Sequence, residues 1–127
     1  MDQERFEKGL AKRKATLGAD YVEKALAQAD DFSRPFQEMM TEFCWGFGWG
    51  DETLDARTRS MLNLTMIAAL NRMHEWELHL NGAIRNGVTR DEIRAVLHQI
   101  AIYCGVPAGV ECFRIAKRVF AEQDGAA

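Results

Sequence analysis

The sequence predicts an all-α protein, and three observations support that class. Only two prolines occur in 127 residues. Apolar side chains recur at the three- and four-residue spacing of helices, and no run alternates apolar and polar residues as a strand does. The length suits one domain with a sizeable core, so residues 1–127 are expected to form a single domain whose tail, from about residue 121, is disordered.

Three helices are predicted in the first third of the chain. The first covers about residues 3–17 and stops at Gly18, a residue type that favours the end of a helix. Asp20 can cap a second, short helix. Ser33 can cap a third, which tolerates Pro35 in its first turn.

A segment rich in glycine and aromatic residues, 44–50, follows the third helix and is predicted to be a loop. Three glycines alternate there with Trp45, Phe47 and Trp49, a composition that makes a poor helix. The aromatic side chains would either cover the core, pack on a neighbouring subunit or wall a pocket. Trp45 is therefore a candidate substrate contact.

The next predicted helix starts at Asp55. Its residues 61–70 are apolar almost all round, which predicts a helix buried on most sides, in part by a neighbouring subunit. Another helix follows and ends at residues 86–87.

A capping box marks the following helix, because Thr89 and Glu92 have the spacing at which each side chain caps the other's backbone. That helix runs to Cys104 and is broken at residues 105–107. A last helix is predicted from Pro107 to about residue 120.

Composition excludes several classes of function. The net charge of -3 and the absence of a basic cluster argue against nucleic-acid binding. No apolar stretch reaches membrane-spanning length and no cationic leader precedes an apolar run, so a cytoplasmic protein without a signal peptide or membrane contact is expected. Cys44, Cys104 and Cys112 form no zinc or Cys-x-x-Cys pattern and are expected to be small buried side chains in a reducing compartment.

The segment from Arg72 to His79 carries the most chemistry. On a helix Arg72, Glu75 and His79 would share one face, which would bring a cation, a carboxylate and an imidazole together. Such a set can transfer a proton beside an anchor for an anion. The alternative is an ordinary surface ion pair between Glu75 and His79, worth a few tenths of a kcal/mol, about 0.3–0.5.

The order of these segments resembles the carboxymuconolactone decarboxylase family of the alkylhydroperoxidase D-like superfamily, over almost the whole chain. The resemblance is sharpest in Leu54-Asp55-Ala56-Arg57-Thr58-Arg59, His79-Leu80, Arg85-Asn86-Gly87-Val88-Thr89-Arg90-Asp91-Glu92-Ile93 and Tyr103-Cys104-Gly105-Val106-Pro107-Ala108. It implies a helical alkylhydroperoxidase D-like domain that assembles as a homo-oligomer, a hexamer or trimer of dimers.

The peroxidase branch of this superfamily has a glutamate, two cysteines as Cys-x-x-Cys, and a histidine four residues later. Carried over position by position, Ser60 replaces the glutamate, Arg72 and Glu75 replace the cysteines, and His79 alone is retained. Without a dithiol, thiol peroxidase chemistry is excluded at this position.

The resemblance implies cofactor-independent decarboxylation of 4-carboxymuconolactone to the 3-oxoadipate enol-lactone, in the β-ketoadipate pathway of aromatic-compound degradation. No metal or organic cofactor is required, because the lactone itself accepts the electrons that carbon dioxide leaves behind. His79 is the first choice for the proton donor, and Glu75 would orient the imidazole and raise its pKa, although the two roles could be exchanged. Arg72 would anchor the carboxylate that stays on the small anionic substrate.

His98 and Tyr103 are the remaining candidate substrate contacts. His98 lies on a helix that flanks the site in this fold, but a hydrogen-bonded core histidine is the commoner case. Tyr103 could donate a hydrogen bond to an oxyanion or place its ring in the core. Rival functions are a related enzyme acting on another carboxylated lactone or enone, and a non-catalytic oligomeric scaffold.

Overall fold

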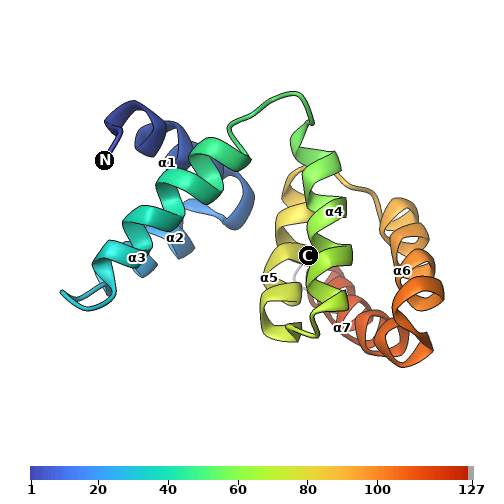
Figure 1. Cartoon of the computed structure of the whole chain (residues 1–127). Helices are drawn as coiled ribbons and strands as arrows, with labels where there is room; N and C mark the ends of the chain where they lie inside the picture. The colour runs from blue at the N-terminus through green and yellow to red at the C-terminus, as the bar shows by residue number, and fades with distance from the viewer. Residues whose placement is uncertain (126–127) are drawn as a thin grey trace. The chain divides into compact units, whose positions relative to one another are not determined.

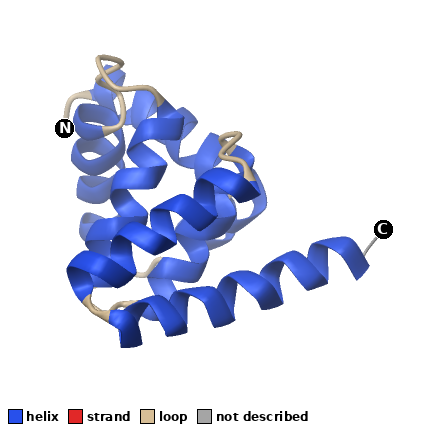
Figure 2. Cartoon of the chain, turned by 90° about the vertical axis from the view of Figure 1, so that its right-hand side faces the viewer, coloured by secondary structure: helices blue, strands red, loops and turns tan. Residues whose placement is uncertain are grey.

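The computed structural model describes residues 1–125, and these residues form eight helical segments and no strand (Figures 1 and 2). The prediction of an all-α protein is confirmed. The chain divides into two compact units, Met1–Arg59 and a second that begins at Ser60. None of the helices in residues 1–125 is long and apolar enough to cross a membrane.

The first unit contains α1 (Gln3–Leu17), α2 (Ala19–Ala27), α3 (Arg34–Met39) and η1 (Met40–Gly48). The predicted bounds of the first helix are confirmed, since Asp2 caps its start and Gly18, with φ 95°, ends it. Gly18 also precedes α2, so this helix begins before Asp20, which lies in its first turn. The prediction that Asp20 caps α2 is therefore wrong.

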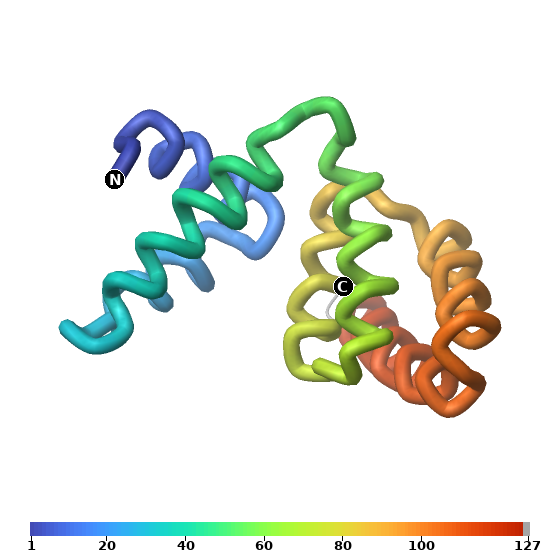
Figure 3. Tube along the Cα trace, viewed as in Figure 1, coloured from blue at the N-terminus to red at the C-terminus, as the bar shows by residue number. Residues whose placement is uncertain are grey.

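The glycine-rich segment is not the predicted loop. Its residues 44–48 belong to the π-helix η1, which continues directly from α3 (Figure 3) and ends with a 3.1 Å bond from Trp49 N–H to the Cys44 carbonyl, five residues earlier. Its glycines allow contact with α1. A Cβ atom added to Gly46 would lie 2.3 Å from the carbonyl oxygen of Arg5.

The second unit contains most of α4 (Ala56–Ala69), then α5 (Met73–Arg85), α6 (Arg90–Cys104) and α7 (Val106–Gly125). The predicted start of α4 is confirmed by a 2.8 Å bond from Thr58 N–H to the Asp55 carboxylate. The capping box of α6 is also confirmed, with both Thr89 and Glu92 bonds present. Gly105, with φ 107°, separates α6 from α7.

The four helices of the second unit surround one apolar core. Its largest fully buried side chains are Leu64, Trp76, Leu80, Ile93, Leu97 and Ile100. Burial of each such side chain contributes about 1.5–3 kcal/mol. Helix α4 buries only one face, however, since Leu62 and Met66 are 43% and 53% exposed, and Leu70, directly after the helix, is 67% exposed. The expectation that this helix is buried on most sides does not hold within one chain.

Helix α7 extends beyond its predicted end. Residues 121–125, expected to belong to a disordered tail, continue the helix to Gly125. Arg90 of α6 holds the carboxylate of Asp124 through two hydrogen bonds of 3.1 and 2.8 Å, and Arg118 pairs with Glu122 one turn later. The rest of the expected tail, residues 126–127, lies outside the described residues.

Candidate active site on helix α5

The connection between α4 and α5 determines where the candidate site begins. Asn71 adopts a left-handed conformation with φ 57°. Its N–H bonds to the Ala68 carbonyl at 3.0 Å, and Arg72 N–H bonds to the Ile67 carbonyl at 3.2 Å. These two bonds form the Schellman motif that closes α4, and asparagine tolerates the left-handed position well.

Arg72 therefore does not belong to the helical face on which the sequence placed it. It is the N-cap of α5, with φ -103° and ψ 73°, and its carbonyl accepts the first helical bond from Trp76 N–H at 2.9 Å. The tight reversal after α4 uses Arg72 in the turn, so only Glu75 and His79 share a face within α5. The side chain of Arg72 is exposed at the helix start.

Glu75 and His79 lie one turn apart at the edge of the buried face of α5. Glu75 is exposed and His79 is half-buried, whereas Trp76 and Leu80 beside them are fully buried. Burial lowers the pKa of His79, and the negative charge of Glu75 offsets part of that effect. As expected, Glu75 raises the pKa of His79. The pKa is nevertheless lowered overall, because desolvation is the larger effect.

The other candidate residues lie on different helices. His98 is exposed on α6, with its ring centroid 5.8 Å from that of Phe113, so it is not a core histidine. Tyr103 is 79% exposed near the end of α6, which rules out the alternative that its ring fills the core. Trp45 belongs to the first unit, where it is 3% exposed and stacks on Trp49 at 4.8 Å.

Ser60, which we matched to the glutamate of the peroxidases from the sequence, takes part in a hydrogen bond between two helices. Ser60 is buried, and its hydroxyl accepts a 3.0 Å hydrogen bond from the side-chain amide of Asn86. This bond joins α4 to the end of α5.

The three cysteines are free thiols, and none of them forms a disulfide within residues 1–125. Cys44 and Cys104 are exposed, contrary to the expectation that all three are buried, and Cys112 alone is fully buried. Burial, with the charges of Glu111 and Cys104, raises the pKa of the Cys112 thiol to about 11. Burial also raises the pKa of Cys44. Such thiols stay protonated near neutral pH and are poor nucleophiles.

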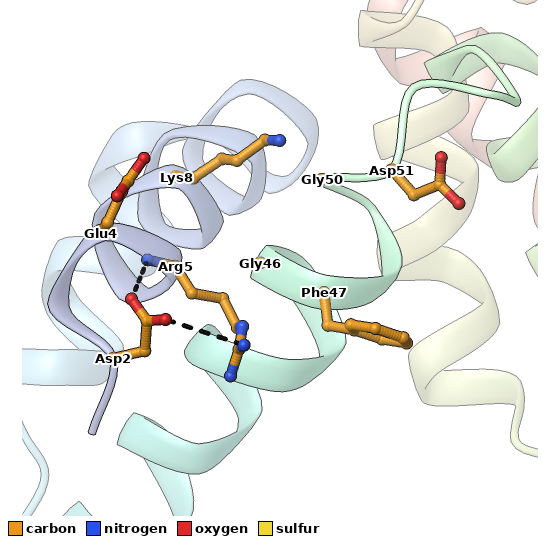
Figure 4. A pocket seen from close by; sticks show the side chains of 8 residues that line it. All are labelled: Asp2, Glu4, Arg5, Lys8, Gly46, Phe47, Gly50 and Asp51. Atoms are coloured by element: carbon orange, nitrogen blue, oxygen red, sulfur yellow. Dashed lines mark hydrogen bonds and ion pairs between the residues drawn. The ribbon is translucent and has the colours of Figure 1, made fainter.

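A cavity in the first unit was not predicted from the sequence. It has a volume of about 480 Å³ and lies between the start of α1 and the end of η1, where Arg5, Lys8, Phe47 and Asp51 are among its lining residues (Figure 4). Arg5 faces Asp2 there and also donates to the buried Glu42 at 3.0 Å. The cavity is lined by side chains of both charges, and none of the predicted site residues lies in it. Among residues 1–125 no group of three or more His, Cys, Asp or Glu side chains is arranged to hold a metal ion.

Comparison with known proteins identifies the family. The model of the carboxymuconolactone decarboxylase family matches residues 34–118. The nitrosuccinic acid decarboxylase npaB of Metarhizium robertsii is 42% identical over 113 residues, covering 89% of this chain and 79% of that protein. The 4-carboxymuconolactone decarboxylase of Acinetobacter baylyi is 34% identical over 119 residues, covering 94% of this chain and 89% of that protein.

A third relative, an uncharacterized 15.0 kDa protein of Paracoccus denitrificans, is 32% identical over 87 residues, covering 67% of this chain and 65% of that protein. The family match covers more than half of the chain and agrees with its helical architecture. The chain therefore belongs to the carboxymuconolactone decarboxylase family and has its helical, alkylhydroperoxidase D-like fold.

Proposed function

We propose that this protein decarboxylates 4-carboxymuconolactone to the 3-oxoadipate enol-lactone without a cofactor, as a step in aromatic-compound degradation through the β-ketoadipate pathway. The observation that carries the proposal is the half-buried His79 beside Glu75 on α5, in a chain 34% identical to a 4-carboxymuconolactone decarboxylase over 94% of its length. An imidazole and a carboxylate are the groups that a proton-transfer step requires.

The reaction divides into loss of carbon dioxide and protonation of carbon. When the carboxylate leaves, its bonding electrons spread as a dienolate onto the lactone carbonyl. The protein then supplies one proton to carbon. Burial lowers the pKa of His79, so the neutral imidazole predominates near neutral pH, and an imidazolium formed at this position releases its proton more readily than a free one does. Glu75 orients the ring, or exchanges roles with it.

Arg72 is the proposed anchor for the substrate carboxylate that remains. Its guanidinium leaves the chain at the start of α5, where the positive end of the helix dipole also favours an anion. A tight grip on the departing carboxylate would stabilise the ground state and slow its loss, so the anchor suits the carboxylate that stays.

Tyr103, His98 and Trp45 remain proposed substrate contacts of lower rank. The exposure of Tyr103 leaves its hydroxyl available to donate to an oxyanion, and His98 is accessible on α6. The ring of Trp45 already packs against Trp49, so only its edge is left for a ligand.

Nitrosuccinic acid is a second candidate substrate, because the fungal decarboxylase named for it is 42% identical to this chain. The two substrates share their chemistry. In each, loss of carbon dioxide leaves a negative charge on the carbon that carried the carboxylate. A neighbouring group accepts this charge, the unsaturated lactone in one substrate and the nitro group in the other. Each also keeps a second carboxylate on a CH2 arm. The same acid and the same anchor could serve both.

We also propose that the protein is a homo-oligomer, a hexamer or trimer of dimers, in the cytoplasm. The exposed side of α4, formed by Leu62 and Met66 and continued by Leu70 directly after the helix, supports an interface, because monomers rarely expose a large apolar patch. The exposed thiols of Cys44 and Cys104 suit a reducing compartment. Sedimentation velocity would contradict the oligomer if it gave the mass of one chain.

A comparison of the two substrates tests the proposed function. Purified protein is mixed with freshly generated 4-carboxymuconolactone or with nitrosuccinate, and the decay of the lactone absorbance or the release of carbon dioxide is followed. We expect the larger kcat/KM with 4-carboxymuconolactone. A larger value with nitrosuccinate would select the second candidate, and no acceleration of either would refute the function. Arg72→Lys should raise KM more than it lowers kcat.

A further inference from the structure

Helices α6 and α7 form a groove on their exposed side, and neither Glu75 nor His79 lines it. Two adjoining cavities make up this groove. The larger has a volume of about 580 Å³ and is lined mainly by apolar side chains such as Val106 and Val110. The smaller, about 250 Å³, contains Leu97. Phe113 and Lys117 of α7 line both cavities, and we call the whole the α6–α7 groove.

The helix packing explains why an apolar floor is open here. A Cβ atom added to Gly109 would lie 2.7 Å from the Cβ of Ala101, so the glycine lets α7 approach α6 closely at one end of the groove. Further along α7, the half-buried ring of Phe113 packs on the edge of the core and lies 5.8 Å from the ring of His98 on α6, at 41°. The ring therefore keeps part of its surface exposed to the groove.

The groove has an excess of positive charge. The lining of the larger cavity includes Arg114 and Lys117 and no carboxylate. Arg114 pairs with Glu111, and on the smaller cavity Arg94 pairs with Asp91. Lys117 has no ion pair with any residue in 1–125. Its ammonium is thus available to an anion that lies against Phe113.

We propose that the α6–α7 groove binds an aryl carboxylate, with the aromatic ring against Phe113 and the carboxylate paired with Lys117. The larger cavity is within the range of about 300–1,000 Å³ that is usual for small-molecule sites. An inorganic anion would leave the apolar floor unused, and an uncharged arene would leave Lys117 without a partner. The site is separate from the α5 pair and does not depend on the proposed reaction.

A titration of the whole protein with 4-fluorobenzoate, followed by ¹⁹F NMR, tests the site. We expect saturable binding by the wild type. Lys117→Gln should weaken it about fivefold, the effect of losing an ion pair of about 1 kcal/mol, and Lys117→Arg should keep it within about twofold. The matched control is Lys24→Gln, which removes another exposed lysine, on α2, and should leave the affinity unchanged.

Two further measurements separate this groove from the α5 site. His79→Ala should bind 4-fluorobenzoate as the wild type does, and benzyl alcohol, which lacks the charge, should bind at least about fivefold more weakly than the benzoate. The proposal is overturned if the wild type shows no saturable binding, or if Lys117→Gln binds as tightly as the wild type. It is also overturned if His79→Ala, and not Lys117→Gln, abolishes binding.

Discussion

The indole Nε1 of Trp76 donates a buried hydrogen bond of 3.0 Å to the backbone carbonyl of Leu64. This bond joins α5 to α4 through the core of the second unit, and it fixes the rotation of α5 about its axis. Glu75 precedes Trp76 and His79 follows it by three residues, so the rotation decides how far the imidazole is buried. A packing contact thus sets the chemistry of the proposed acid.

Trp76→Phe should lower both stability and activity. The substitution keeps an aromatic ring but removes the hydrogen bond and leaves a cavity, at a cost of about 1–3 kcal/mol in the free energy of unfolding. Urea denaturation measures this cost, with Leu54→Ala in an exposed loop as the control that should change little. An unchanged unfolding midpoint in Trp76→Phe would show that the bond does not hold α5.

Local signals in the sequence were enough to predict most of the helices. The capping box at Thr89, the aspartate at position 55 and the stop at Gly18 each act through bonds with residues at most four positions away. Such signals act over one turn and are visible in the sequence. The pairing of Glu75 with His79 follows from the same helical spacing.

Features that depend on packing could not be predicted. The segment 44–50 has the composition of a loop because glycine is a poor helix former, yet residues 44–48 belong to a π-helix that packs on α1, and Gly46 is required for that contact. From its position in the sequence, Arg72 should share a helical face with Glu75 and His79. The left-handed Asn71 ends α4 just before it, however, so Arg72 lies in the turn before α5. The direction of the His79 pKa shift depends on burial, which the sequence does not reveal.

Gly9→Ala should strongly destabilise the first unit. An added Cβ would lie 2.0 Å from the carbonyl oxygen of Thr41, so α1 and η1 would have to separate, at a cost of about 3 kcal/mol. Gly48→Ala is the matched control, because its Cβ would meet nothing closer than 3.7 Å. Thermal denaturation should show a large loss for the first variant only. Equal melting temperatures for the two would refute the close contact.

Thr89→Ala should lower the free energy of unfolding by about 1 kcal/mol, because it leaves the Glu92 N–H at the start of α6 without its acceptor. Thr89→Ser keeps the hydroxyl and should retain most of the stability. Chemical denaturation of the two variants beside the wild type measures the difference. If serine and alanine were equally destabilising, the hydroxyl bond would not be the cause.

The lowered pKa of His79 should appear as a pH dependence of stability. Below its usual pKa of 6.5 the unfolded chain binds more protons than the folded chain, so this contribution is complete above 6.5 and is lost as the pH falls through the folded-state pKa. His79→Gln should therefore lose less stability than the wild type between pH 7 and about pH 5.

NMR titration of the His79 ring should place its midpoint below 6.5, and Glu75→Gln should lower that midpoint further, because the carboxylate raises it in the wild type. A midpoint above 6.5, or no shift in Glu75→Gln, would contradict the arrangement of the pair.

The central claim is that His79 transfers the proton in a decarboxylation that needs no cofactor. The most direct measurement is carbon dioxide release from 4-carboxymuconolactone and from nitrosuccinate, with EDTA present and the thiols alkylated, for the wild type and for His79→Ala. We predict that the wild type accelerates release from at least one of them, and that His79→Ala lowers kcat at least about 100-fold. Carbon dioxide release at the same rate from both proteins, or at the uncatalysed rate from the wild type, would contradict the claim.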